Sequence, residues 1–241
     1  MSEPALAISF VDPERGVHGT ARSGFTLLFE GHSAASHPEG PSIEAAGDGW
    51  HAELPGKLAL DFAPVGAVAD TGGARASFCT VSGQACGANI DGLGLVTETI
   101  TPPRWDELEV LRSVHALFDP EHAVIAVARR PEGAAGHGEE HVTAHLLSGG
   151  ELLTVEDARL STIYDGEGRP RQAGMELWLP GEDFPRRAFG TVTAGVSLAL
   201  DTTSGRPPLD VHAAVMSWRM EGRDGAGVYE LTVREPAPAA A

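Results

Sequence analysis

Glu176 and Trp178 lie two residues apart in an apolar run and are the residues here best suited to acid chemistry. In an extended strand, alternation places both side chains on one face and puts three apolar neighbours on the other, namely Met175, Leu177 and Leu179. A carboxyl group held beside an indole in a cavity stays protonated and can donate a proton. We therefore predict Glu176 as the catalytic acid if the protein is an enzyme. The alternative is that the aliphatic face forms the core and Glu176 is solvated.

A second run, 211–220, carries large apolar side chains at every other position. The stripe consists of His212, Ala214, Met216, Trp218 and Met220. As a barrel lining it would suit a flexible apolar ligand, because methionine adapts its shape and tryptophan offers a large surface. We predict five ligand-binding residues, namely Trp178, Trp218, Met216, Met220 and His212. As plain core, the stripe would need no ligand.

Other catalytic signatures are absent from the sequence. There is no glycine-rich phosphate loop, no Gly-x-Ser-x-Gly elbow and no Cys-x-x-Cys pair, so we expect no cofactor. His141 and His145 are the best metal-ligand candidates, yet four residues along a strand span roughly 13 Å, too far for one ion. We therefore expect no metal site. Cys79 and Cys86 are interpreted as thiols rather than a bridge.

Charge and hydrophobicity limit the class of partner. The 241-residue chain has a formal net charge of −17, which would repel nucleic acids and anionic membranes at long range. No window approaches the ~20 apolar residues of a membrane span, and residues 1–9 do not read as a signal peptide. We expect a cytoplasmic protein whose partner is a small hydrophobic ligand, with no nucleic-acid or membrane partner. The sequence predicts no particular oligomeric state.

A short phrase occurs twice, as Asp91-Gly92-Leu93-Gly94 and as Asp224-Gly225-Ala226-Gly227. Each copy follows an alternating run, which is the pattern of a strand, a glycine-relieved turn and a second strand. We interpret the repeat as a tandem duplication of one β unit. The glycines Gly92, Gly94, Gly225 and Gly227 are predicted as structural turn positions that need a positive φ or a tight bend.

The elements that must position these residues are short alternating runs separated by Gly, Pro and Asp clusters about every ten residues. Segment 105–118 fits a helix or a strand, and the turn at Asp119-Pro120 favours a central hairpin. The predicted fold is all-β, with two tandem lipocalin-like antiparallel barrels or half-barrels. We place the first half, including the central hairpin, at 1–130, the second at 131–235, and a disordered tail at 236–241.

The phrase Trp218-x-x-x-Gly222-Arg223-Asp224-Gly225-x-Gly227-x-x-Glu230 and the central Pro103-Arg104-Trp105 resemble the tandem lipocalin-like family that includes carotenoid 1,2-hydratases. The resemblance implies two calycin-like barrels and acid-assisted hydration or cyclisation of apolar isoprenoid or polyketide substrates without a cofactor. It assigns no catalytic residue, and this chain is shorter than typical members.

The expected function is binding of a small hydrophobic molecule, such as an isoprenoid, steroid or lipid, in a barrel or at the seam between barrels. If the protein is an enzyme, we expect acid-assisted hydration, isomerisation or cyclisation. The alternative is a non-enzymatic β-rich module that contacts another protein.

Overall fold

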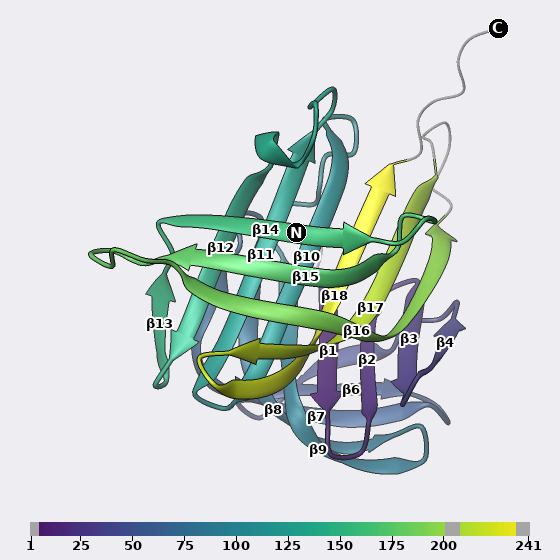
Figure 1. The fold of residues 1–241 in the computed structure, drawn as a ribbon. Coiled ribbons are helices and arrows are strands. Elements are labelled where there is room, and N and C mark those ends of the chain that lie inside the picture. Colours follow the sequence, from purple (N-terminus) through teal and green to yellow (C-terminus); the bar gives the residue numbers. More distant parts are fainter. Residues whose placement is uncertain (1–4, 201–207, 235–241) are drawn as a thin grey trace, which may run out of the picture.

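The computed structural model describes residues 5–200 and 208–234, and this part of the chain consists almost entirely of strands (Figure 1). One short 3-10 helix, η1 (His137–Glu139), is the exception among these residues. The prediction of an all-β fold is confirmed. No helix in the described ranges is long and apolar enough to cross a membrane. The predicted tail at 236–241 lies outside the described residues.

The strands form two antiparallel nine-stranded sheets. The first has the order β4-β3-β2-β1-β9-β8-β7-β6-β5 and comprises β1 (Ala5–Asp12), β2 (Val17–Arg22), β3 (Phe25–Glu30), β4 (Ser33–His37), β5 (Ser42–Ala46), β6 (Gly49–Leu54), β7 (Leu58–Asp70), β8 (Ala74–Ala85) and β9 (Ala88–Thr99). The second has the order β13-β12-β11-β10-β18-β17-β16-β15-β14 and comprises β10 (Leu108–Asp119), β11 (His122–Pro131), β12 (His141–Ser148), β13 (Glu151–Thr154), β14 (Asp157–Tyr164), β15 (Pro170–Trp178), β16 (Arg186–Leu200), β17 (Leu209–Met220) and β18 (Arg223–Arg234). Adding nine to each label of the first order gives the second, so one arrangement occurs twice.

The repeated phrase occupies equivalent strands of the two sheets. Its first copy lies in β9, which pairs with β1, and its second lies in β18, which pairs with β10. In both sheets this pairing joins the first strand of the half to its last strand. The duplication predicted from the sequence is therefore present in the strand order.

The central hairpin belongs to the second sheet, which corrects its placement in the first half. Segment 108–131 forms β10 and β11, so the choice of hairpin over helix is confirmed. β10 hydrogen-bonds to β18, whose sequence lies more than a hundred residues later. The strands of the two sheets thus divide within 100–107 rather than near 131. The division into separately folding domains stays a prediction.

Each sheet curls around its own apolar core, and the two sheets also pack on each other. In Figure 1, β14, β15 and β16 cross in front of β10, β11 and β12, which shows the curl of the second sheet. Two further clusters draw residues from both sheets: Phe78 and Leu95 pack with Ile125, and Phe25 packs with Val215. Because these clusters are buried, the seam between the sheets is itself a packed core.

The repeated glycines lie within strands rather than in turns, which corrects the prediction for Gly92, Gly94, Gly225 and Gly227. None of the four has a positive φ. A Cβ on any of them would clash with a backbone oxygen of the neighbouring strand, those of Val11, Ser9, Leu117 and His115 respectively. The glycines are therefore required because β9 and β18 approach β1 and β10 closely.

The turns themselves lie a few residues earlier. Cys86 and Gly87 connect β8 to β9, and Glu221 and Gly222 connect β17 to β18; all four residues have positive φ values. A two-residue loop with positive φ at both positions matches the twist of the strands it joins. The prediction that Cys79 and Cys86 are free thiols is confirmed.

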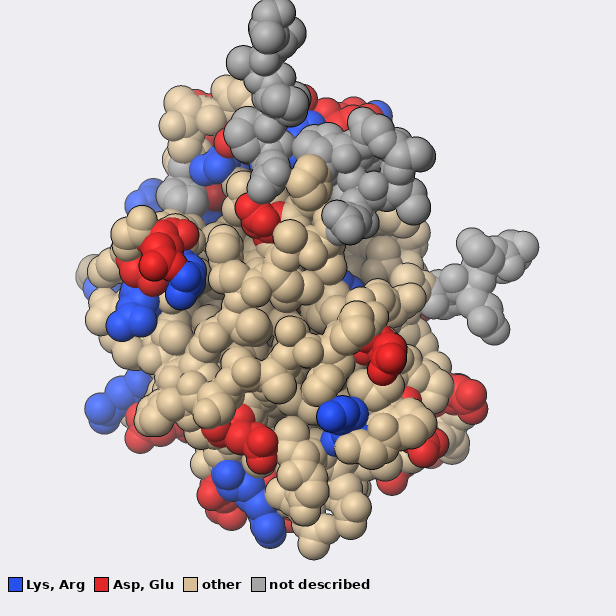
Figure 2. Space-filling model, turned by 90° about the vertical axis from the view of Figure 1, so that its right-hand side faces the viewer, with Lys and Arg blue, Asp and Glu red and all other residues tan. Residues whose placement is uncertain are grey.

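The centre of one face of the molecule is free of charge in spite of the net charge of −17 (Figure 2). Figure 2 shows that charged side chains lie mainly around the margin of this face, while its centre is uncharged. β4 and the middle of β16 lie against each other here, and neither 33–36 nor 188–200 contains a charged side chain. This uncharged surface extends over both sheets along one side of the seam.

Candidate functional site

A cavity of about 370 Å³ lies between the two sheets, beside the linker 100–107. We call it the seam cavity. Its walls come from β1, β2, β8 and β9 of the first sheet and from β10, β11, β16, β17 and β18 of the second. Its large apolar lining consists of Trp105, Leu111, Ile125, Val127, Leu200 and Leu209. Ligand sites in proteins span ~300–1,000 Å³, so this cavity has the size for a small molecule.

Strand alternation explains which residues reach this cavity. On β11, Ile125, Val127 and Arg129 line the seam cavity, while Val124 and Ala126 point into the core of the second sheet. Both faces of β11 are therefore apolar over most of its length, as expected for a strand buried on both sides. The seam face differs at Arg129, where the apolar row ends in a cation.

Charged groups occur at two places in the lining. Arg22 on β2 and Glu230 on β18 form an ion pair of 2.7 Å that joins the two sheets. Arg129 has no acidic partner within hydrogen-bonding distance among the described residues, and burial lowers its pKa. The lining thus carries two cations and one anion, a local excess of positive charge in an acidic protein.

Hydroxyl groups supply the remaining polar surface of the seam cavity. Thr97 and Thr99 come from β9, Ser113 from β10 and Thr232 from β18. A mainly apolar cavity with a few hydroxyls and a charged group can bind a small molecule and fix its orientation. The sequence predicts a seam site in general terms, and none of these residues is among the predicted ligand-binding residues.

A second feature missed by the sequence analysis is a buried polar cluster inside the second sheet. Arg112 on β10 forms an ion pair with Glu140, and both side chains are 1% exposed. Arg112 also donates to Thr162 Oγ1 at 3.0 Å and to the Leu160 carbonyl at 3.0 Å. The Tyr229 hydroxyl lies 2.8 Å from Thr162 Oγ1. Polar groups this deep in a core are stable only when hydrogen-bonded to one another.

Electrostatics link the members of this cluster. Burial lowers the pKa of Arg112, but the neighbouring Tyr229 and Glu140 outweigh that effect and raise its pKa overall. Burial raises the pKa of Tyr229, so its hydroxyl stays protonated. A sequence signal exists, because Arg112 occupies a core position between Val110 and Val114 on an otherwise apolar stripe. Its acidic partner could not be identified from spacing.

The predicted acid, Glu176, lies on the outer face of β15, in the mixed polar and apolar lining of a cavity of about 770 Å³ that shares no residue with the seam cavity. It forms an ion pair of 2.9 Å with Arg187 on the adjacent strand. Trp178 lies on the same outer face, half-buried, with the guanidinium of Arg159 5.0 Å from its ring centroid. The apolar face of this strand is core, as in the alternative interpretation. A catalytic role for Glu176 stays a prediction that this geometry does not support.

The predicted stripe on β17 points into the core of the second sheet. Met216, Trp218 and Met220 are buried there, so the plain-core alternative describes their packing. Trp218 packs against Gly190, where any Cβ would come within 2.8 Å of the indole ring. Trp178 and Trp218 therefore occupy opposite faces of the second sheet, and they do not share a site. Ligand contact by these residues stays a prediction.

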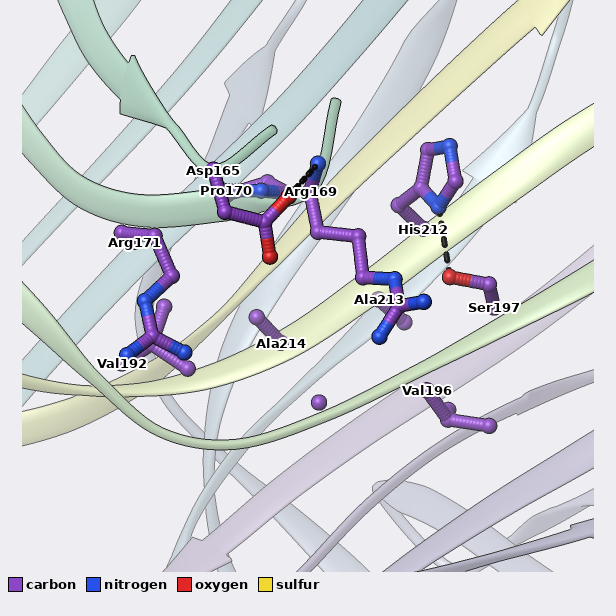
Figure 3. A pocket seen from close by; sticks show the side chains of 11 residues that line it. Asp165, Arg169, Pro170, Arg171, Val192, Val196, Ser197, His212, Ala213 and Ala214 are labelled. Atoms are coloured by element: carbon purple, nitrogen blue, oxygen red, sulfur yellow. Dashed lines mark hydrogen bonds between the residues drawn. The ribbon is translucent and has the colours of Figure 1, made fainter. Parts of the chain in front are cut away.

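His212 lies apart from the other predicted site residues, at a small cavity of about 110 Å³ (Figure 3). Its Nδ1 lies 2.6 Å from Ser197 Oγ, and Figure 3 shows these two side chains facing each other. Asp165, in the same lining, accepts a hydrogen bond from the Arg169 backbone at 2.9 Å. Burial lowers the pKa of His212. This cavity has room for only a few water-sized molecules, so we do not assign it to an apolar ligand.

Among the described residues, the predicted metal-ligand candidates His141 and His145 are not part of a metal-binding group. His145 Nε2 lies 2.6 Å from the carbonyl oxygen of Asp70, and no His, Cys, Asp and Glu group of three or more forms a candidate metal site in residues 5–200 and 208–234. His115 instead joins the sheets: its Nε2 accepts from the Val228 backbone N–H and lies 3.2 Å from Ser9 Oγ. Burial lowers the pKa of His115 to about 4, so this histidine is neutral at pH 7.

Comparison with known proteins gives similarity in fold only. No family model and no curated protein matches the sequence. The solved structures that resemble it include an AttH-like protein from Nitrosomonas europaea, with a TM-score of 0.61 at 13% identity over 95% of this chain and 91% of that one. Kievitone hydratase from Nectria haematococca has a TM-score of 0.58 at 8% identity over 96% of this chain and 89% of that one. The arrangement of two curled sheets is thus shared with a hydratase.

Proposed function

We propose that this protein binds a small, largely apolar molecule in the seam cavity. The observation that carries the proposal is a mainly apolar cavity of about 370 Å³ between the sheets, beside the buried clusters that pack the sheets together. An interface that served only to hold the two sheets together would be stabilised by filling that volume. Leu111, Ile125 and Val127 offer a ligand the apolar contacts, and Ser113 and Thr97 offer hydrogen bonds.

Hydration, isomerisation or cyclisation of the bound molecule is a finer proposal. It is supported by the fold shared with kievitone hydratase and by the presence of a carboxylate, Glu230, in the cavity lining. Glu176 lies on the outer face of β15, so Glu230 is better placed to exchange a proton with a ligand in this cavity. A Glu230→Gln variant should then retain binding and lose turnover, provided that Arg22 keeps its hydrogen bond to the amide.

Native mass spectrometry of gently purified protein, followed by solvent extraction and mass analysis, tests the binding proposal. We expect a stoichiometric apolar molecule, or stoichiometric binding from a panel of isoprenoids, steroids and fatty acyl compounds. An empty protein that binds no member of the panel would contradict the proposal.

A protein-interaction module is the second candidate, and the uncharged face formed by β4 and β16 favours it (Figure 2). Charged residues are depleted in the core of protein interfaces. If the panel fails and the protein instead self-associates through this face, charged substitutions such as Thr191→Glu should abolish the association. Experiments on the same purified sample therefore distinguish the ligand-binding function from the protein-interaction function.

A further inference from the structure

Arg129 is placed in the seam cavity in a way that packing alone does not explain. It follows Ile125 and Val127 on the seam face of β11, with its guanidinium against the turn 70–73. A Cβ on Gly73 would lie 3.5 Å from Nη2 of Arg129, and the glycine leaves that side of the guanidinium without a covering side chain. The cation is therefore half-buried and faces the cavity.

The neighbouring charges do not compensate Arg129. Its neighbour along the strand, Arg130, forms an ion pair of 3.2 Å with Glu109, and Arg22 is paired with Glu230. Among the described residues, no acidic group lies within ion-pair distance of Arg129, although the chain has 34 acidic residues against 17 basic ones. A half-buried guanidinium without an anion is unfavourable and is expected to gain from binding one.

We infer that the ligand of the seam cavity is an apolar molecule with a carboxylate at one end, and that Arg129 binds the carboxylate. The inference rests on the proposed function and adds the chemical class of the ligand. The apolar body would contact Leu111, Ile125 and Val127, which lie on the strands beside the guanidinium. Arginine is suited to this role because its planar fork donates two parallel hydrogen bonds to a carboxylate.

Calorimetric titration of the full chain with matched acids and alcohols tests the inference. The pairs are octanoate with octan-1-ol and geranate with geraniol, which share an apolar body and differ in charge. We expect the wild-type protein to bind each acid at least tenfold more tightly than its alcohol. Arg129→Met keeps most of the side-chain length and should reduce this ratio to about one, with alcohol affinity unchanged. Arg129→Lys should restore part of the preference.

Arg130→Met is the control variant, because it removes the adjacent cation from outside the cavity lining and should leave the ratio unchanged. Equal affinity of the wild-type protein for acid and alcohol would overturn the inference and leave the binding proposal intact. An acid preference that survives in Arg129→Met would also overturn it. If neither acids nor alcohols bind, both the inference and the proposed function fail.

Discussion

Replacing Glu140 by glutamine should strongly destabilise the protein. Glutamine keeps the shape of the side chain and can still accept a hydrogen bond, but it removes the negative charge beside Arg112. Both side chains are 1% exposed, so water cannot replace the lost countercharge. Breaking one partner of a buried ion pair costs about 3–5 kcal/mol. Against a total stability of about 5–15 kcal/mol, that is a large fraction.

Urea unfolding followed by circular dichroism measures this loss. Glu107→Gln is the matched control, because Glu107 forms an exposed ion pair of 2.7 Å with Arg104 and should cost about 0–1 kcal/mol. The double variant Arg112→Met/Glu140→Leu removes both charges and should recover most of the stability. A loss below about 1 kcal/mol in Glu140→Gln would refute the assignment of this pair to a water-free core.

The other predictions concern the seam. Gly227→Ala should lower the melting temperature by several degrees, because its Cβ would clash with the backbone of β10. Gly136→Ala is the control, because its Cβ would lie in open space and should leave the melting temperature unchanged. Equal melting temperatures of the two variants would contradict the close approach of β18 to β10. Burial lowers the pKa of His115 and of His18 to about 4, so stability should be complete above pH 6.5 and fall as pH drops from 6.5 toward 4, by up to about 3 kcal/mol for each histidine. In unfolding measurements at several pH values, the free energy of unfolding should fall less steeply with decreasing pH in His115→Gln than in the wild-type protein. Trp105 lines the cavity, so a bound ligand should change the fluorescence of the wild-type protein and not that of Trp105→Phe.

Strand content and duplication were predictable because they depend on local patterns. Period-two alternation between turn residues indicated strands along the whole chain, and the turn at Asp119-Pro120 correctly favoured the hairpin β10–β11. The repeated phrase marked equivalent strands because the glycines of each copy lie against the backbone of the equivalent neighbouring strand, β1 or β10. The sheet to which the hairpin belongs was not predictable, because the partner strand β18 is far away in sequence.

The site could not be predicted from alternation, because alternation does not say which face is empty. On β17 both stripes are buried over 213–216, where Met216 points into the core of the second sheet and Val215 packs against the first sheet. On β15 the large aromatic lies on the outer face, so the size of Trp178 was misleading. The seam cavity depends on how two sheets meet, and Arg129 and Glu230 reach it from strands far apart in sequence.

The central claim is that the seam cavity holds the ligand, and filling that cavity tests it most directly. Ser113 lines the cavity, and Ser82 is exposed on the first sheet, so Ser113→Phe and Ser82→Phe make the same chemical change at two places. We would titrate both variants, checked for folding by their melting curves, with whichever panel compound binds the wild-type protein. Binding should weaken at least tenfold in Ser113→Phe and stay unchanged in Ser82→Phe. Equal binding by a folded Ser113→Phe protein would contradict the account.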